Sequence, residues 1–169
     1  FGSRPPPLPC PRPRGAMAEA PGAPAEGLGT LLDAQGKEVE ASGLGKKSVA
    51  LYFAGEWCPM CRDFTPELKA FTDGSPEKQV VFVSSDFSSE EFEHHRSTMG
   101  EGYLAVPYGS AKQDELKRSF RIWGGREKGT FGEGRRSGLP SLVVVDAASG
   151  AELQHLDAEA QGKAVLEKW

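Results

Sequence analysis

The sequence predicts an α/β fold in which helices cover both faces of a central mixed β-sheet. Three short apolar runs, at residues 49–53, 80–83 and 142–145, are typical of strands buried inside a sheet. Helical patterns separate these runs, so the elements follow the order strand, helix, strand and then helix, strand, strand, helix. This order places parallel and antiparallel neighbours in one sheet.

The first 27 residues are expected to form a disordered tail. They hold eight of the thirteen prolines and show no apolar periodicity, so they cannot bury enough surface to offset the entropy lost on ordering. Cys10 lies in this tail with no partner nearby. The folded domain should therefore extend over residues 28–169, starting with a short hairpin at residues 31–39.

Helix signals follow each of the first two central strands. A helix over residues 62–71 follows the first strand, and Pro66 inside it should cause a kink because proline removes a backbone hydrogen bond. Two capping boxes, at residues 88–91 and 110–113, predict helices that reach about residues 98 and 121. Residues 103–108 form an extended piece between them.

The last part of the chain should complete the sheet. Residues 151–156 follow the third strand after a turn and are expected to pair with it, and residues 158–169 close the chain as a helix. The preceding segment, residues 124–138, contains six glycines, four basic and two acidic side chains. Such a composition predicts a long loop without regular structure, which is usually either functional or disordered.

Two cysteines, Cys58 and Cys61, lie where the first strand gives way to its helix. Such a pair can close and reopen a disulfide ring if the first sulfur is a thiolate. Cys58 would be the helix N-cap and Pro59 the first helical residue, so free amides and the helix dipole would stabilise a Cys58 thiolate. We expect Cys58 to attack and the better shielded Cys61 to resolve. Arg62 could lower the pKa of Cys58 further, or could simply be solvated.

Zinc binding and simple packing are the alternative roles for these cysteines. A closed zinc site needs four ligands, and the other candidates are Cys10, the adjacent pair His94 and His95, and His155. Adjacent helical residues point about 100° apart and rarely bind one ion. A solvated helix surface explains the histidine pair better.

Composition limits the possible partners. The formal net charge is −4, from 20 Lys and Arg against 24 Asp and Glu, which gives no reason to expect nucleic-acid or anionic-membrane binding. No apolar run is long enough to span a membrane. A lone Cys-x-x-Cys without a secretory signal indicates a redox pair in a thiol-reducing compartment, so we expect a cytoplasmic protein.

Five landmarks in chain order resemble the tryparedoxin and nucleoredoxin branch of the thioredoxin superfamily. They are the motif at residues 57–61, the mid-helix Pro66, and the segments 81–86, 104–108 and 138–142. The resemblance covers about residues 28–169 and implies a thioredoxin fold.

The resemblance also implies roles for individual residues. Cys58 corresponds to the nucleophile, Cys61 to the resolving thiol and Trp57 to the tryptophan that shields the pair. Pro140 matches the cis-proline that lies against the disulfide, and the backbone of Leu139 would then be free to pair with an extended substrate segment.

The chain departs from the family pattern at two active-site positions. Met60 stands where tryparedoxins typically carry a second proline, so the redox potential need not match theirs. Tyr52 stands where thioredoxins proper place a buried aspartate. The group that deprotonates Cys61 is therefore not identified, and Glu56 is near in sequence but could be solvated.

The insertion at residues 124–138 is a third departure. Because it leads directly into Pro140, it should lie near the active-site rim, where Arg135 and Arg136 could select an acidic partner or thiol. A tolerated flexible insertion is the alternative.

These features together predict a thiol-disulfide oxidoreductase similar to tryparedoxins. It would act as a monomer, take electrons from a low-molecular-weight dithiol or a reductase, and reduce protein disulfides such as those of peroxiredoxins. No metal or organic cofactor is required, because each step exchanges one S–S bond for another. The alternatives are a nucleoredoxin-like binding module whose redox state sets its affinity, and a disulfide oxidase or isomerase.

Overall fold

The computed structural model describes residues 25–45 and 47–169. Its first element is strand β1 (Ala25–Leu28), which begins three residues before the expected start of the domain. The remainder of the expected tail, with Cys10, lies outside the described residues.

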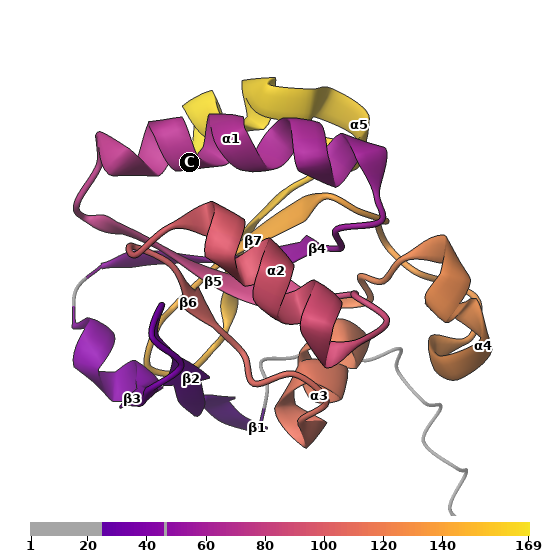
Figure 1. Cartoon of the computed structure of the whole chain (residues 1–169), viewed down its shortest axis with the longest axis horizontal. Helices are drawn as coiled ribbons and strands as arrows, with labels where there is room; N and C mark the ends of the chain where they lie inside the picture. Colours follow the sequence, from indigo (N-terminus) through magenta and orange to yellow (C-terminus); the bar gives the residue numbers. More distant parts are fainter. Residues whose placement is uncertain (1–24, 46) are drawn as a thin grey trace, which may run out of the picture.

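A seven-stranded mixed sheet forms the centre of the domain, as expected (Figure 1). The strand order is β3-β2-β6-β5-β4-β7-β8. Strand β4 runs parallel to the middle strand β5 and antiparallel to β7, so the cysteine pair follows a strand inside the sheet. The strands of the sheet are β2 (Thr30–Leu32), β3 (Glu38–Glu40), β4 (Ser48–Ala54), β5 (Lys78–Ser84), β6 (Leu104–Ala105), β7 (Ser141–Val145) and β8 (Glu152–Leu156).

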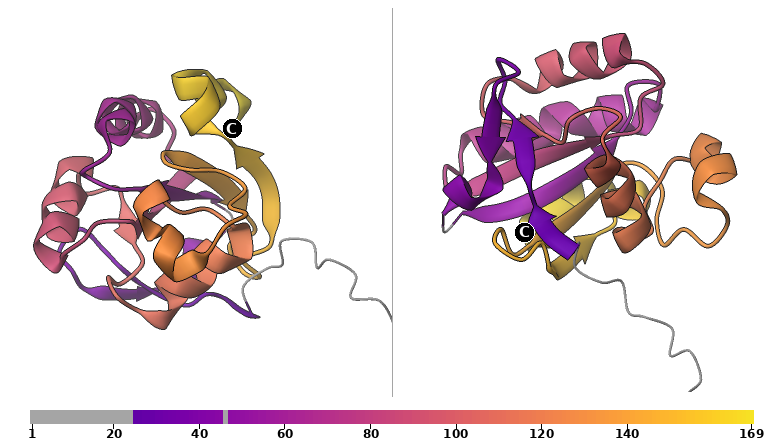
Figure 2. Two further views of the ribbon diagram at one scale, coloured as in Figure 1. Left: turned by 90° about the vertical axis from the view of Figure 1, so that its right-hand side faces the viewer. Right: turned by 90° about the horizontal axis from the view of Figure 1, so that it is seen from below.

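Helices cover both faces of this sheet (Figure 2). Tyr52 and Phe82 are neighbours on β4 and β5 and pack against Phe64 of α1 (Pro59–Asp73) and Phe92 of α2 (Ser89–Met99). Phe53 points to the other face, where its ring meets Phe120 of α3 (Ala111–Phe120). Alternate residues of one strand therefore anchor helices on opposite faces.

The end of the chain is helical but not one continuous α-helix. It begins as α5 (Ala158–Gln161) and continues as a 3-10 helix, Gly162–Lys168. This segment lies beside α1 on the same face of the sheet (Figure 1). The side chain of Asp157 caps α5 by accepting a hydrogen bond from the Ala160 N–H.

Both predicted capping boxes start helices, with one change in geometry. The hydroxyls of Ser88 and Ser110 accept hydrogen bonds from backbone N–H groups three residues later, at 3.1 and 3.3 Å. In an ordinary capping box, the side chain three residues after the N-cap serine accepts a hydrogen bond from the N–H of that serine. Here it accepts from the N–H of the residue before the serine. Glu91 accepts from the N–H of Phe87, which fixes Phe87 at the start of α2.

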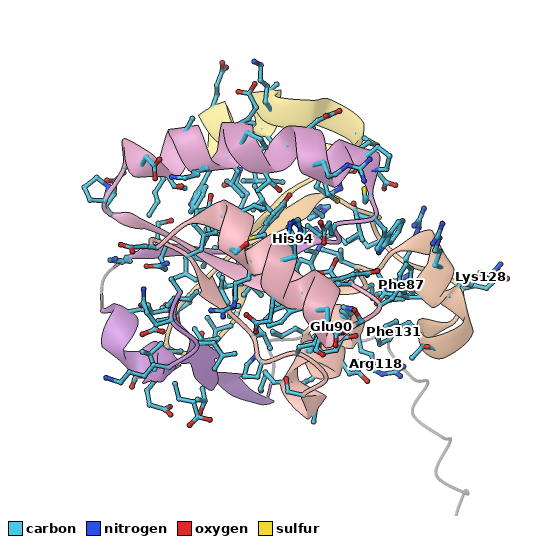
Figure 3. All side chains as sticks on the ribbon, viewed as in Figure 1. Phe87, Glu90, His94, Arg118, Lys128 and Phe131 are labelled. Carbon is cyan, nitrogen blue, oxygen red and sulfur yellow. The ribbon has the colours of Figure 1, made fainter. Side chains whose placement is uncertain are left out.

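The expectation of a structureless loop at residues 124–138 was wrong. A 3-10 turn, Gly125–Glu127, leads into the short helix α4 (Lys128–Phe131), which stands out beside the sheet (Figure 1). Buried Lys117 bonds Glu127 at 2.5 Å, and the Phe131 ring lies 5.6 Å from that of Trp123. Figure 3 shows Arg118 beside Phe131 and Lys128 on the outer side of α4. The sequence pattern missed this because one aromatic ring and one buried ion pair replace an apolar face.

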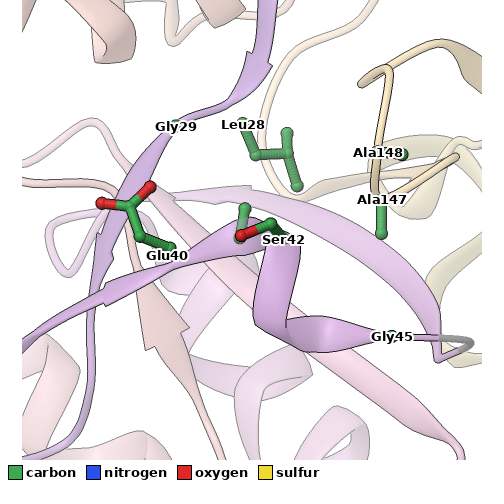
Figure 4. A pocket seen from close by; sticks show the side chains of 8 residues that line it. Leu28, Gly29, Glu40, Ser42, Gly45, Ala147 and Ala148 are labelled. Atoms are coloured by element: carbon green, nitrogen blue, oxygen red, sulfur yellow. The ribbon is translucent and has the colours of Figure 1, made fainter.

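A pocket of about 290 Å³ lies at the opposite end of the sheet from the cysteines (Figure 4). It is formed around Leu28, Glu40, Ser42 and Ala147, close to where β4 begins. Because the cysteine motif follows the other end of β4, the length of this strand separates the pocket from the redox pair.

Candidate active site

Cys58 is the N-cap of α1, and Pro59 is the first helical residue. The Cys58 sulfur accepts a hydrogen bond from the backbone N–H of Cys61 at 3.4 Å. Both cysteines are free thiols, and Cys61 is fully buried. Cys58 is 6% exposed and sits next to the exposed Pro59 and Met60. A substrate sulfur can therefore approach Cys58, but it cannot approach Cys61.

Electrostatics separate the two thiols further. The hydrogen bond with the Cys61 side chain lowers the pKa of Cys58 to about 6, helped by the backbone N–H groups of Cys61 and Met60. Burial and the negative charge of Glu159 act in the opposite direction. Burial, and secondly the Cys58 hydrogen bond, raise the pKa of Cys61 far above its ordinary value. At neutral pH the pair therefore consists of a Cys58 thiolate and a Cys61 thiol.

The Leu139–Pro140 peptide bond is cis, and this segment lies directly against Cys58. The carbonyl oxygen of Leu139 is 3.7 Å from the Cys58 sulfur and accepts a hydrogen bond from it when the thiol is protonated. The segment thus forms one wall beside the nucleophile, the position that the family resemblance implies for Pro140 and Leu139.

A shallow cavity of about 310 Å³ continues from this wall. It runs between the first turns of α1 and the C-terminal helical segment, next to the nucleophile. Its lining residues are Met60, Asp63, Phe64, Glu67, Pro140, Ala158, Gly162 and Lys163. The cavity offers both apolar surface and charge of both signs beside the redox pair.

Trp57 directly precedes Cys58 and is held by two other segments. Its indole N–H donates a hydrogen bond to the carbonyl oxygen of Ser85 at 2.7 Å. Its ring stacks on that of Phe87, with 5.6 Å between centroids, and Phe87 is 49% exposed on the side facing α4 (Figure 3). The guanidinium of Arg126 lies 5.1 Å from the Trp57 ring and 5.3 Å from the Phe87 ring.

The sequence pattern did not point to Arg126 or Phe87. Nothing in it distinguishes Arg126 from the other basic residues of the insertion, and Phe87 precedes a helix as an isolated apolar residue. Their contact depends on the tertiary position of the insertion, which brings Arg126 onto two rings far away in sequence.

The predicted selectivity residues Arg135 and Arg136 have different positions. Arg136 makes two hydrogen bonds to Glu152 on β8, at 2.7 and 2.9 Å, so it attaches the insertion to the sheet. Arg135 is more exposed and lies 3.7 Å from Glu159. The insertion therefore presents Arg126 and Arg135 at the rim, whereas Arg136 is paired away from it.

Arg62 points away from the nucleophile. Its side chain is exposed and donates a hydrogen bond to the carbonyl oxygen of Glu56 at 3.1 Å. The groups that shift the pKa of Cys58 most are Cys61, Met60 and Glu159, so the structure favours the solvated role for Arg62.

The histidine pair does not form a solvated helix surface, and for His95 that expectation was wrong. His95 is buried with its ring edge-on to Phe82 at 4.7 Å, whereas His94 is exposed and contacts the Glu56 carboxylate. His155 lies on β8 and contacts the Ser141 hydroxyl at 2.9 Å. In the described ranges, no three His, Cys, Asp or Glu side chains come together as a metal site.

Tyr52 occupies the interior below the redox pair. Its hydroxyl lies 3.0 Å from the Thr65 hydroxyl and donates to the carbonyl oxygen of Cys61 at 3.4 Å. Burial raises the pKa of Tyr52 well above its ordinary value, so the phenol keeps its proton. It cannot act as the base that a buried aspartate would provide.

Comparison with known proteins agrees with this geometry. A family model described as thioredoxin-like matches residues 45–152. Mouse nucleoredoxin is 33% identical over 123 residues, which cover 70% of this chain and 25% of that protein. A probable nucleoredoxin 3 from rice is 39% identical over 122 residues, covering 68% and 22% respectively. The chain thus spans only about a quarter of these relatives. Among the described residues, no helix is long and apolar enough to cross a bilayer.

Solved structures show the same likeness over most of the chain. Tryparedoxin I from Crithidia fasciculata is 32% identical, with a TM-score of 0.60 over 84% of this chain and 86% of that one. Thioredoxin from Wuchereria bancrofti is 30% identical, with a TM-score of 0.64 over 86% and 91%. The chain belongs to the thioredoxin-like family, in its tryparedoxin and nucleoredoxin branch.

Proposed function

We propose that this protein is a thiol-disulfide oxidoreductase that reduces the disulfides of other proteins. The observation that carries the proposal is the asymmetry of the pair: Cys58 is a thiolate with a pKa of about 6 that keeps 6% exposure, and Cys61 is a fully buried thiol with a strongly raised pKa. Simple packing does not require this asymmetry. A nucleophile and a shielded resolving thiol do require it.

The proposed reaction has two exchange steps. The Cys58 thiolate attacks a substrate disulfide, which forms a mixed disulfide and releases one substrate thiolate. Cys61 then loses its proton and attacks the Cys58 sulfur. This step forms the Cys58–Cys61 disulfide and releases the second substrate thiolate, so two electrons pass to the substrate. No metal or organic cofactor takes part in either step.

The surroundings of Cys58 support an extended peptide as the substrate. The cis Leu139–Pro140 segment provides a backbone edge beside the sulfur, and the adjoining cavity provides apolar surface around Met60. Disulfide-containing proteins such as peroxiredoxins fit this arrangement as acceptors. A solved tryparedoxin II is described as a complex with glutathionylspermidine, which supports a low-molecular-weight thiol as electron donor. A thiol-reducing compartment such as the cytoplasm would keep the pair reduced.

A second candidate is a redox-sensitive binding module of the nucleoredoxin type. The exposed side chains around the nucleophile favour it, because Met60 is 46% and Phe87 is 49% exposed. A Cys58→Ser variant distinguishes the two functions. An oxidoreductase loses all turnover in this variant, whereas a binding module keeps its partner.

The first test is alkylation of the reduced protein by iodoacetamide as a function of pH, measured at each cysteine by mass spectrometry. The proposed function predicts that Cys58 reacts with a midpoint near pH 6 and that Cys61 reacts far more slowly. A Cys58 midpoint near about 8.5, the ordinary value for a thiol, would contradict the proposal.

A further inference from the structure

The resolving step needs a proton acceptor near Cys61. This residue is a buried thiol with a strongly raised pKa, yet it must become a thiolate to attack Cys58. Tyr52 holds its own proton. Glu56 contacts His94 at the surface. A buried acid or base close to Cys61 that is not already paired at the surface would meet this need.

Asp86 is a buried carboxylate beside the turn that carries the cysteines. It lies between β5 and α2, and its side chain is 0% exposed. It accepts hydrogen bonds from the Glu56 N–H at 2.6 Å and from the Ser84 hydroxyl at 2.7 Å. The preceding N–H, that of Gly55, interacts with the Cys61 sulfur, and the charge of Asp86 also raises the pKa of Cys61. Asp86 and Cys61 therefore interact with adjacent peptide groups.

His95 completes a pair with Asp86. Its Nδ1 lies 3.4 Å from the Asp86 carboxylate, and its side chain is only 4% exposed. Among the described residues, Nδ1 makes only this contact with Asp86, and Nε2 has no hydrogen-bond partner. A buried imidazole nitrogen without a partner is unusual, because leaving a buried polar atom unpaired costs about 1–3 kcal/mol. A functional role accounts for it.

A cavity borders His95 and the part of α1 that follows Cys61. It has a volume of about 310 Å³ and lies between α1 and α2. His95 lines it together with Thr65, whose hydroxyl donates a hydrogen bond to the carbonyl oxygen of Cys61 at 2.8 Å. The cavity is large enough for solvent and has polar walls, so it can hold solvent that relays a proton.

Several charged and titratable side chains surround the Asp86–His95 pair, and they lie on each of the segments that pack against it. Arg62, Lys69, Glu56 and His94 line the cavity. The Tyr108 hydroxyl donates to the carbonyl oxygen of Asp86 at 3.3 Å, and burial raises the pKa of Tyr108. Arg96 sits over the Phe92 ring, on the same helix as His95.

These charges and contacts determine which member of the pair can hold a proton. Burial alone would raise the pKa of Asp86, but the contacts from His95, Glu56 and Ser84 outweigh it and leave that pKa below its ordinary value. Asp86 therefore stays ionised. With Nδ1 of His95 facing this carboxylate, the unpartnered Nε2 is the atom of the pair that is free to accept a proton.

We infer that the Asp86–His95 pair accepts the proton of Cys61 during the resolving step. In the mixed disulfide, the proton passes from the Cys61 thiol to the His95 imidazole, and the Asp86 carboxylate stabilises the resulting imidazolium. The Cys61 thiolate then attacks the Cys58 sulfur and expels the substrate thiolate. After the disulfide has formed, the imidazolium returns its proton to solvent through the cavity. This inference rests on the proposed oxidoreductase function.

The two exchange steps can be measured separately with dithiobis(nitrobenzoate), a chromogenic aromatic disulfide. Attack by Cys58 releases the first coloured thiolate, and resolution by Cys61 releases the second. The test compares the unsubstituted protein with Asp86→Asn and His95→Gln in single-turnover stopped-flow experiments over a range of pH. Glu90→Gln is the matched control, because it changes an exposed carboxylate of the same helix that does not line the cavity.

We expect both Asp86→Asn and His95→Gln to slow the second release at neutral pH by at least about tenfold, near the lower end of the effect of general acid–base catalysis. The first release should change little, and the second should recover as the pH rises, because hydroxide then removes the Cys61 proton. Purely structural damage would not recover with pH. Glu90→Gln should leave both releases unchanged.

Two results would overturn the inference. Both concern the second release, whereas failure of the proposed oxidoreductase function would appear in the first release. If the second release keeps its rate and pH profile in both variants, the pair is not the acceptor. If Glu90→Gln slows it as much as His95→Gln, the effect does not belong to the buried pair. Loss of the first release in the unsubstituted protein would instead contradict the oxidoreductase proposal. Should Asp86→Asn fail to fold, His95→Gln alone decides the outcome.

Discussion

The carboxylate of Glu159 accepts a hydrogen bond from the backbone N–H of Gly138, at 2.7 Å. A side chain at Gly138 would not leave room for this contact, since an added Cβ would lie 2.3 Å from a Glu159 oxygen. Gly138 is two residues before Pro140, so Glu159 ties the segment that borders Cys58 to the start of α5. The same carboxylate is a negative charge that opposes the Cys58 thiolate.

Glu159→Gln should therefore make Cys58 more acidic. The amide oxygen can still accept from the Gly138 N–H, but the negative charge that raises the pKa of Cys58 is gone. The alkylation midpoint of Cys58 should fall below that of the unsubstituted protein. Glu152→Gln is the control, because Glu152 pairs with Arg136 on β8. An upward shift in Glu159→Gln would show that the contact acts mainly by positioning the segment.

The low pKa of Cys58 should also make the reduced protein more stable as the pH rises from about 6 to about 8.5. In this window the unfolded chain keeps the Cys58 proton and the folded chain has lost it, so the unfolded state binds more protons and the free energy of unfolding increases with pH. Above about 8.5 the raised pKa of Cys61 acts in the opposite direction, because only the unfolded state then releases that proton.

The expected gain in the free energy of unfolding across this window is about 2 kcal/mol. A pKa difference of one unit between the folded and unfolded states changes the free energy of unfolding by roughly 1.4 kcal/mol. Because Cys58 is partly reached by solvent, we expect a smaller gain than the full window would give. Urea unfolding of the reduced protein at several pH values measures the gain. Cys58→Ser should remove the rise below pH of about 8.5. An equal rise in this variant would assign the pH dependence to other groups.

The fold and the redox pair could be predicted from sequence because both depend on local signals. Three apolar runs mark the central strands, and Pro59 after Cys58 marks the start of a helix. The position of Asp86 could not be predicted in this way. It occurs 25 residues after Cys61 in sequence, and only the parallel pairing of β4 with β5 brings its carboxylate onto the Glu56 N–H.

The insertion shows a different limit of sequence reasoning. Its glycine content hides the fact that Phe131 and Glu127 find partners in α3 or next to it, among them Trp123 for Phe131 and Lys117 for Glu127. Two such contacts are enough to fold a short segment, but they leave no periodic pattern. For the same reason, the sequence favoured Arg135 and Arg136 for the rim and overlooked Arg126.

Arg126 and Arg136 should therefore respond differently to substitution. Arg126→Ala removes an exposed positive charge beside Trp57, and an exposed charge pair is worth about 0.2–1 kcal/mol, so it should weaken binding of an acidic protein disulfide by up to about fivefold. Arg136→Ala breaks the ion pair with Glu152 and should lower the free energy of unfolding by up to about 1 kcal/mol without changing KM. Steady-state kinetics and urea unfolding of both variants measure these effects. The reverse pattern would restore Arg136 as the selectivity residue.

Gly124 should be essential for the position of Trp57 because the two residues are in direct contact. A Cβ at Gly124 would lie 2.8 Å from the Trp57 ring and 3.2 Å from the Leu139 side chain. The backbone of Gly124 has φ −67, which alanine adopts easily, so lack of space is the only cost of substitution. Gly124→Ala should destabilise the domain by about 1–3 kcal/mol through overpacking and alter the fluorescence of Trp57.

Gly129 provides the matched control for this substitution. It lies in α4, and no atom is within 4 Å of an added Cβ. Gly129→Ala should be neutral or stabilising by up to about 1 kcal/mol, because alanine loses less entropy than glycine in a helix. Thermal unfolding and fluorescence of the two variants give the comparison. If Gly124→Ala is as mild as Gly129→Ala, Trp57 can move away without cost, and the insertion does not fix its position over the redox pair.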